Sequence, residues 1–375
     1  MKRKLFNGDV LDSFGMNPLG VANAGVRADQ AAMWAVLKHY TGRPLCATQQ
    51  WDTIQLDGAL SPHWDWIQAH YAEVGLSVTG EVVWDASFGV AAASEFAGHE
   101  LDVFFFGHQA HAVRPNQQWF DITEAMNNKN KLIALCRELG VPTPETQLFD
   151  NKSALRDVAF TYPVYLKVAV SVSGLGVIRC NDRHELETNL DQLADDVPFQ
   201  IQREVAGAKA FLNVQYHVDG QGRVKRGAVS VQILKGNAHD GNRYPTQYQP
   251  WGITDPVASE LARRGMRGYF AFDVVVTADG DFLMIECNPR YNGATFPTIV
   301  AERLQIPQWM ARNFQVNHID FSRLDLNDHV FDSKTGTGVV VFNWGTIGDC
   351  KLGMLVAGTP EQQNRIADAV QSLLA

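Results

Sequence analysis

The feature of this sequence that most constrains its fold is a pair of apolar runs separated by Asp279 and Gly280. An Asp-Gly pair between such runs is a strong signal for a β-hairpin with a two-residue loop. With that loop, Asp273 lies directly opposite Glu286, and Asn288 shares a face with Glu286 because side chains alternate along a strand. The sequence neighbours of both acids are apolar, so we expect these strands to lie inside a sheet.

Two carboxylates that face each other inside a sheet need a partner. The Cβ atoms of directly opposed residues are about 4.5–5.5 Å apart, so the two charges repel, and burial strengthens the repulsion. A hard divalent cation with oxygen ligands removes the conflict, and Mg²⁺ held together with nucleotide phosphates is the usual case. The alternative is an exposed edge hairpin whose carboxylates are solvated. The apolar neighbours favour a metal with Asp273, Glu286 and Asn288 as its ligands.

Composition excludes several classes of protein. The chain has 375 residues, of which 46% are apolar and 19% charged, as in globular proteins, and this length predicts two or three packed modules. The net charge of −9 argues against general nucleic-acid binding, which needs clustered positive charge. No apolar stretch approaches the roughly 20 residues that span a bilayer. Five single cysteines without a CxxC pair indicate reduced thiols in a cytoplasmic protein.

Local patterns predict helices and strands in the middle of the chain. A helix is predicted from a cap at Asn127 or Asn128 to a stop at Gly140. A capping box formed by Asp182 and Glu185 predicts a second helix. Strands are predicted at 163–168, 176–180, 211–218 and 224–234, and residues 235–243 are predicted to be a polar loop.

The two ends of the chain give fewer signals. The apolar run 101–106 is typical of a buried strand and is part of an α/β pattern. Near the C-terminus, strands are predicted at 338–342 and 351–356. Thr359 and Gln362 form a capping box that predicts a final helix.

Several motifs, in the same order along the chain, resemble those of the ATP-grasp ligases. The helix after Asn128 resembles that family's opening helix, and Lys129 fits the register of its phosphate-binding lysine better than Lys131. The strand at 162–167 resembles the one that carries a second phosphate-binding lysine, here Lys167. In the family, Lys167 would then contribute to catalysis as well as to nucleotide binding.

Two further segments resemble nucleotide-binding parts of that family. Residues 171–176 resemble the glycine-rich flap over the phosphates, which implies contacts from Ser173, Gly174 and Gly176. Residues 201–207 resemble the hinge that holds adenine.

In that hinge, Gln202 stands where a glutamate is frequent, and backbone groups of Arg203 and Val205 would meet the adenine edge. Lys209 stands where a ribose-binding acid is often seen, so no ribose ligand is assigned.

The resemblance also assigns roles around the hairpin. Asp273, Glu286 and Asn288 fall on the family's magnesium positions, with Mn²⁺ as an alternative ion. Arg290 is similar to an arginine that stabilises an acyl phosphate or anchors a substrate carboxylate, although a structural ion pair between Arg290 and Glu286 is a serious alternative.

The predicted polar loop before the hairpin contains two further candidates. His239 and Arg243 are candidate substrate contacts there, and a loop that simply faces solvent is an equal alternative.

The resemblance covers roughly residues 120–320 and implies an α/β (α+β) chain with the ATP-grasp fold. We expect an N-terminal pre-ATP-grasp α/β domain at 1–120, the ATP-grasp domain at 121–325 with a lid at about 160–205, and a ββα module at 326–375. The flanking modules resemble those of peptide ligases of the pheganomycin type.

The implied activity is a carboxylate–amine ligase that uses ATP and Mg²⁺, forms an acyl phosphate and releases ADP and phosphate. Its implied partners are small amino-acid or peptide-like substrates, with no nucleic acid and no membrane, and a homodimer is compatible with the resemblance. The alternatives are an ATP-grasp carboxylase and a nucleotide-binding module without catalysis.

Overall fold

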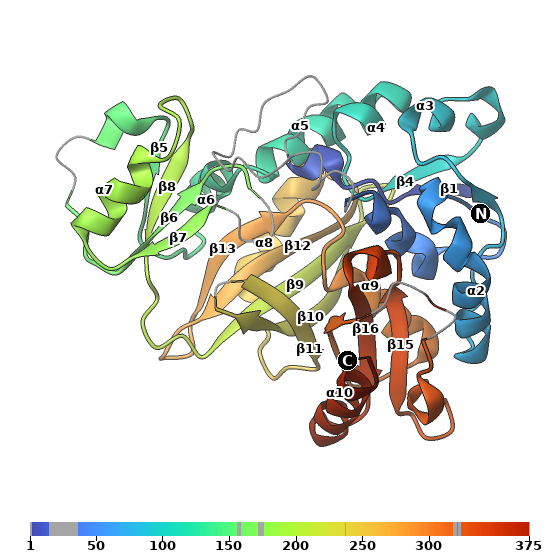
Figure 1. Cartoon of the computed structure of the whole chain (residues 1–375). Helices are drawn as coiled ribbons and strands as arrows, with labels where there is room; N and C mark the ends of the chain where they lie inside the picture. Colours follow the sequence, from blue (N-terminus) through green and yellow to red (C-terminus); the bar gives the residue numbers. More distant parts are fainter. Residues whose placement is uncertain are drawn as a thin grey trace.

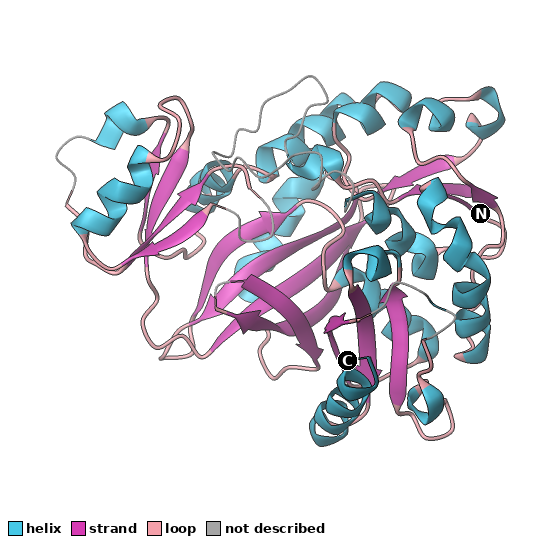
Figure 2. Ribbon diagram, viewed as in Figure 1, coloured by secondary structure: helices cyan, strands magenta, loops and turns pink. Residues whose placement is uncertain are grey.

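The chain folds into three β-sheets with helices packed around them (Figures 1 and 2). The computed structural model describes residues 2–14, 37–155, 159–171, 176–236, 238–317, 321 and 324–374. One sheet is parallel and the other two are antiparallel, so the predicted α/β (α+β) class is confirmed. Within the described residues, no helix is both long and apolar enough to cross a bilayer.

The N-terminal sheet is parallel, with the strand order β3-β2-β1-β4. Its strands are β1 (Lys4–Asn7), β2 (Thr53–Gln55), β3 (Val82–Val83) and β4 (Glu100–Val103). The predicted strand at 101–106 therefore ends at Val103, and the three phenylalanines after it continue past the carboxyl end of β4. Helical segments connect the strands: 3₁₀ helices Leu11–Phe14, His39–Ala47, Gly58–His63 and Ser94–Phe96, and α2 (Trp64–Glu73), α3 (Phe88–Ala91) and α4 (His108–Val113).

A small antiparallel sheet, at the left of Figure 1, has the strand order β5-β8-β6-β7. Its strands are β5 (Thr146–Phe149), β6 (Val164–Val168), β7 (Val177–Cys180) and β8 (Phe199–Arg203). Helix α7 (Arg183–Asp191) packs on its apolar face, and the 3₁₀ helix Lys152–Leu155 follows β5. The predicted capping box begins α7, because Asp182 accepts a hydrogen bond from the Glu185 N–H.

The large sheet has eight antiparallel strands in the order β13-β12-β9-β10-β11-β14-β16-β15. They are β9 (Ala210–Val218), β10 (Val224–Lys235), β11 (Ala238–Tyr244), β12 (Gly268–Val276), β13 (Phe282–Asn288), β14 (Trp309–Gln315), β15 (Gly338–Asn343) and β16 (Lys351–Ala357). The prediction of a polar loop at 235–243 is wrong, because β11 pairs with β10 on one side and with β14 on the other. The two C-terminal strands extend this sheet rather than forming one of their own.

The two faces of the large sheet differ in chemistry. Alternate residues Leu212, Val214, Phe272 and Val274 pack on one face against α5 (Gln117–Met126), α6 (Lys129–Glu138) and α8 (Trp251–Arg263). The residues between them, including Asn213 and Asp273, point to the opposite face. A buried polar row on one face of a sheet is costly unless its members are paired, so this face is where we place the site.

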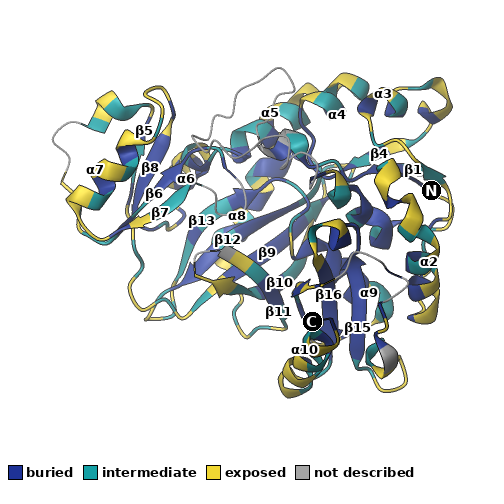
Figure 3. Ribbon diagram, in the orientation of Figure 1, coloured by how far each residue is buried: buried dark blue, intermediate teal, exposed yellow. Residues whose placement is uncertain are grey.

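A separate apolar core holds the N-terminal and C-terminal parts of the chain together. It contains side chains from the 3₁₀ helix His39–Ala47 and α2 together with side chains from α9 (Thr295–Leu304), β14, β15, β16 and α10 (Pro360–Leu374). Figure 3 shows that most of the central strands are buried. Two short 3₁₀ helices, Asn327–His329 and Gly345–Asp349, complete the described C-terminal part.

Candidate active site

The two hairpin acids face each other as the sequence predicts. Asp273 on β12 is directly paired with Glu286 on β13, and Asn288 donates a 3.1 Å hydrogen bond to Asp273 Oδ2. The loop is nevertheless longer than predicted, because Val276 is paired with Phe282 and the Thr277 N–H bonds to Asp281 O.

The longer loop shifts the pairing of β12 with β13 by one residue relative to the prediction. A β-bulge between Asp273 and Val274 shifts the pairing back. It leaves Ile285 without a directly opposed residue on β12, so the pairing shifts by one residue before it reaches Glu286. The predicted two-residue loop is therefore wrong, while the predicted opposition of the two acids is right.

Three amides surround the Asp273 carboxylate. Asn213 on β9 and Gln232 on β10 donate to its Oδ1 at 3.0 and 2.8 Å, and Asn288 donates to its Oδ2. Sequence reasoning missed Asn213 and Gln232. The signal that could have revealed Asn213 is the strict alternation of polar and apolar residues along 212–218, which marks a strand with one polar face; Gln232 lies outside that stretch.

Three hydrogen bonds therefore fix the position of the Asp273 carboxylate, but its surroundings disfavour its charged form. Its burial, and then the nearby charge of Glu286, raise the pKa of Asp273 to about 7, although the amides of Asn213 and Asn288 favour the charged form. A divalent cation between the two carboxylates would remove their repulsion. Two carboxylates and the side-chain oxygen of Asn288 form an all-oxygen donor set of the kind that Mg²⁺ prefers, so the residues present fit that ion. Within the described chain, no cluster has three or more His, Cys, Asp or Glu side chains suited to a metal.

Lys129 contacts this site from the first turn of α6. Its Nζ lies 3.2 Å from Glu286 Oε1 and donates to the backbone oxygen and the hydroxyl of Ser171, both at 3.0 Å. Asn128 caps the helix by accepting from the Lys131 N–H, which confirms the second of the two predicted caps. Lys129 is buried whereas Lys131 is exposed, so the register chosen from the sequence matches the geometry.

Lys167 lies on the face of the small sheet opposite to α7. Its Nζ donates a 2.6 Å hydrogen bond to Gln202 Oε1, and Gln202 Nε2 in turn donates to Thr146 Oγ1 at 3.0 Å. Burial lowers the pKa of Lys167 to about 8; the charge of Glu286 opposes this shift and the charge of Lys129 adds to it. A lysine whose best partner is a neutral amide is prepared to bind an incoming anion.

Fewer contacts are seen for the other residues that the sequence predicts to bind the nucleotide. The Arg203 N–H donates to Glu145 O, and the side chains of Arg203 and Lys209 are exposed while Val205 is half-buried. Gly176 precedes β7 with a φ of +67°, which favours glycine. Ser173 and Gly174 lie outside the described residues.

Arg290 lies two residues after the end of β13 and is half-buried. Burial lowers its pKa, and the charges of Glu286 and Asp273 oppose that shift. Among the described residues, the ion-pair partner of Glu286 is Lys129 and not Arg290, so the structural alternative for Arg290 is not supported.

The two candidates on β11 point in different directions. His239 lies on the polar face, where its Nε2 is 2.6 Å from Asn242 Oδ1 and its ring lies over Gly293. Arg243 instead donates a 2.7 Å hydrogen bond to Asn364 Oδ1 on α10, away from the polar face, and its contact with a substrate stays a prediction. A spacing of four residues keeps two side chains on the same face of a regular strand, but the pairing of β10 with β11 has a β-bulge between His239 and Arg243, and this bulge turns the two side chains to opposite faces.

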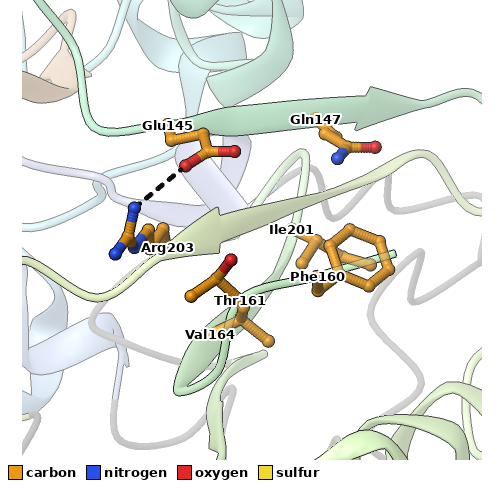
Figure 4. A pocket seen from close by; sticks show the side chains of 7 residues that line it. All are labelled: Glu145, Gln147, Phe160, Thr161, Val164, Ile201 and Arg203. Carbon is orange, nitrogen blue, oxygen red and sulfur yellow. Dashed lines mark hydrogen bonds and ion pairs between the residues drawn. The ribbon is translucent and has the colours of Figure 1, made fainter. Parts of the chain in front are cut away.

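A small hollow in the small sheet is not part of this site (Figure 4). It is lined by Glu145, Gln147, Phe160, Thr161, Val164, Ile201 and Arg203 and has a volume of about 10 Å³, enough for one water molecule. Val164 and Ile201 belong to the face that packs on α7, whereas Lys167 and Gln202 point to the other face.

The arrangement of sheets is that of the ATP-grasp fold. The sequence matches no protein-family model and no curated protein. Among solved structures, the chain is similar to N5-carboxyaminoimidazole synthetase from Staphylococcus aureus complexed with ADP, with a TM-score of 0.62 and 10% identity over 89% of this chain and 94% of that one. It is also similar to the L-amino acid ligase from Bacillus licheniformis, with a TM-score of 0.56 and 14% identity over 86% and 92%. A third similar structure is N5-carboxyaminoimidazole ribonucleotide synthetase from Thermus thermophilus, with a TM-score of 0.57 and 15% identity over 86% and 98%.

Proposed function

We propose that this chain, which has an ATP-grasp enzyme fold, is a ligase that joins a carboxylate to an amine at the expense of ATP. The observation that carries the proposal is the meeting of Asp273, Glu286 and Asn288 with two buried lysines, Lys129 and Lys167, from separate elements. Opposed carboxylates next to buried cations are expensive for a merely structural site. They suit a magnesium nucleotide, because the carboxylates can bind the cation and the lysines can bind the phosphates.

Asp273, Glu286 and Asn288 would hold Mg²⁺ in this proposal. When bound, the ion supplies positive charge to the phosphate oxygens and so assists phosphoryl transfer. The chain's own contribution is position. The amides of Asn213 and Gln232 fix the Asp273 carboxylate, and the contact with Lys129 fixes that of Glu286.

The lysines would bind the phosphates directly. Lys129 is held by Ser171 and Lys167 by Gln202, so each ammonium is oriented before the nucleotide arrives. Transfer of the γ-phosphoryl group to the substrate carboxylate would give an acyl phosphate and ADP. Attack by the amine nitrogen would then expel phosphate, with loss of a proton from the amine.

Arg290 would stabilise the negative charge of the acyl phosphate. The charges of Glu286 and Asp273 act on its guanidinium, which supports a role for Arg290 next to the proposed metal ligands. The acyl phosphate must be kept from water, and the predicted flap at 171–176 would contribute to this.

The likeness to a solved L-amino acid ligase supports amino-acid substrates, and the ADP complex among the similar structures supports a nucleotide at this site. The narrower resemblance to pheganomycin-type peptide ligases is part of the proposal and rests on the sequence motifs alone. A carboxylase remains the second candidate, because two of the similar structures are N5-carboxyaminoimidazole synthetases.

The test is a screen of paired amino acids and small carboxylic acids with MgATP, read by phosphate release and mass spectrometry. We expect ADP and phosphate only when both a carboxylate and an amine are present, and a hydroxamate when hydroxylamine replaces the amine. Release of AMP and pyrophosphate would exclude the acyl-phosphate route. Turnover that depends on bicarbonate would identify a carboxylase, and MgATP binding without turnover would identify a non-catalytic module.

A further inference from the structure

Arg43 is a half-buried cation that the proposed chemistry does not use. It lies on the 3₁₀ helix His39–Ala47, and its guanidinium carbon is 3.7 Å from the centre of the Tyr40 ring and 5.9 Å from that of Phe104. A guanidinium stacked on an aromatic ring uses its face for that contact. Its N–H donors point outward in the plane and remain available for a planar or tetrahedral anion.

In the part of the chain that the structure describes, these donors form no side-chain ion pair, and one of them has no hydrogen-bond partner. Arg43 Nε is buried without a hydrogen-bond partner, and among the described residues no acidic side chain forms an ion pair with Arg43. Burial, with a further contribution from the charge of Arg290, lowers the pKa of Arg43 to about 10. Arginines withdrawn from water are usually paired, so an unpaired one indicates an absent anion.

Arg43 lies beside the loop that carries Arg290. The N–H of Tyr291, the next residue after Arg290, donates to Phe104 O at 3.2 Å, and Phe104 is one of the rings near Arg43. His239 reaches the same loop, because a Cβ added at Gly293 would lie 2.9 Å from its ring. The charge of Arg43 also contributes to lowering the pKa of His239, after the larger effect of burial.

The topology of the N-terminal sheet points to the same place. Strand β1 lies between β2 and β4, so the direction in which strands are added reverses between β1 and β4. Ligands of open parallel sheets bind outside the carboxyl ends of the strands at such a reversal. Phe104 immediately follows β4 there, and its N–H bonds to Asn7 O at the end of β1.

Arg290 is two residues from Asn288 along the chain, whereas Arg43 lies on a separate segment and is stacked on Tyr40. The charges of Asp273 and Glu286 affect the pKa of Arg290, whereas the charges that affect the pKa of Arg43 are those of Tyr40 and Arg290. A substrate that reaches the metal site at one end would therefore place a different group beside Arg43.

We propose that Arg43, with Arg290 and His239 beside it, binds a second oxyanion of the substrate, a carboxylate or a phosphate that is not the group activated by ATP. The assignment of that anion to a substrate rests on the proposed ligase function. The existence of the anion site does not, since it stands on the unpaired guanidinium and its place at the end of the parallel sheet. The substrate class it defines is a small acid or amino acid with an anionic group besides the one that reacts.

The test uses Arg43→Met in the full-length protein, with Arg365→Met on the exposed surface of α10 as the matched control. Binding of succinate and of inorganic phosphate is measured by isothermal titration calorimetry at constant ionic strength, and Tm is measured alongside. We expect wild type and Arg365→Met to bind at least one of these anions, and Arg43→Met to bind it about tenfold or more weakly. The anion that is lost shows whether the site takes a carboxylate or a phosphate.

Without anions, the Tm of Arg43→Met should be close to that of wild type, because Arg43 is half-buried without an ion pair and methionine retains an apolar contact with the Tyr40 ring. Both anions raise the Tm of many proteins by exclusion from the surface, so the decisive quantity is the difference between variants. Unchanged affinity in Arg43→Met, or no binding to wild type, would overturn the proposal. If Arg43→Met does not fold, Arg43→Lys keeps the charge without the planar fork and should also bind more weakly.

Binding of MgATP separates the two proposals. Arg43→Met should bind MgATP as tightly as wild type. If neither protein binds MgATP while the loss of anion binding persists, the ligase proposal fails and the anion site stands.

Discussion

Asp273 and Glu286 differ in how their charges are balanced. Asp273 accepts hydrogen bonds from three amides, whereas Glu286 contacts a lysine and is a quarter exposed. A buried carboxylate that has only neutral donors and faces another acid is the one whose pKa rises. If the pair holds Mg²⁺ as proposed, removal of one charge should affect magnesium-dependent turnover more than folding.

Glu286→Gln should lower Mg²⁺-dependent ATP turnover by roughly 100-fold or more, because it removes one of two charged ligands. Its free energy of unfolding should change little, since the lost contact with Lys129 is offset by the lost repulsion from Asp273. Steady-state kinetics and urea denaturation measure the two effects. Glu187→Gln on the exposed surface of α7 is the control, and near wild-type turnover in Glu286→Gln would count against the metal site.

Lys167 should make nucleotide binding sensitive to alkaline pH. Its pKa of about 8 means that it is charged below pH 8, so attraction to the phosphates is present there and weakens as the pH rises further. Calorimetric titration with MgATP between about pH 7 and pH 9.5 should show the Kd rising above pH 8.

The matching variant is Gln202→Glu, which places a carboxylate where an amide oxygen now lies 2.6 Å from Lys167 Nζ. This change should raise the pKa of Lys167 and move the increase in Kd to higher pH. The exposed Gln221→Glu serves as the control for the added charge. Identical pH profiles for all three proteins would show that Lys167 does not bind the phosphates.

At the scale of elements, signals that act within a few residues predicted the structure well. Both predicted caps form: at α7 the Glu185 N–H donates to Asp182 while the Glu185 carboxylate accepts from the Asn181 N–H, and at α10 Thr359 and Gln362 bond reciprocally. The same holds for α6 and its cap. Caps depend on adjacent residues alone, so the sequence contains all the necessary information.

Features that depend on residues far apart in the sequence could not be predicted from local patterns. The bulge at Ile285 and the longer loop compensate each other, and each by itself would have moved Glu286 out of opposition to Asp273. Strand β11 consists largely of polar residues with low β-propensity, yet two neighbouring strands supply its hydrogen bonds. Arg43 carries no motif, and its role follows only from what surrounds it.

The helix that carries Lys129 allows a direct test of capping. Asn128→Ala should lower the free energy of unfolding by about 1 kcal/mol, because it removes the side-chain acceptor of the Lys131 N–H. Asn128→Asp should retain most of the stability, since aspartate caps equally well. Urea denaturation at neutral pH measures both variants. Equal loss in the two would mean that Asn128 acts through something other than capping.

At the scale of the whole molecule, the ends of the chain hold each other in place. The apolar core that joins α2 and the 3₁₀ helix His39–Ala47 to β15 and β16 connects residues about 300 positions apart, a separation for which no periodicity gives a signal. Buried hydrogen bonds also cross this core, including one from Trp344 Nε1 to Gly42 O at 3.0 Å. The Val341 N–H on β15 donates to His70 Nε2 on α2 at 3.0 Å.

This contact should make the junction sensitive to acid. Burial lowers the pKa of His70 from 6.5 to about 4, so between these values the unfolded chain binds a proton that the folded chain excludes. The contribution of His70 to stability is therefore full above pH 6.5 and decreases as the pH falls towards 4, by up to about 3 kcal/mol. Asp273 acts in the opposite direction, since its raised pKa favours the folded state at lower pH.

Comparison of variants isolates the histidine from this opposing effect. His70→Gln keeps an acceptor for the Val341 N–H without a titrating group, so its free energy of unfolding should fall less than that of wild type between pH 6.5 and pH 4.5. Urea denaturation at several pH values measures the difference, and His184→Gln on the exposed surface of α7 should follow wild type. Parallel pH curves for wild type and His70→Gln would show that acid does not loosen the junction through His70. A steeper fall for wild type and His184→Gln than for His70→Gln would locate the acid-sensitive step where the two ends of the chain meet.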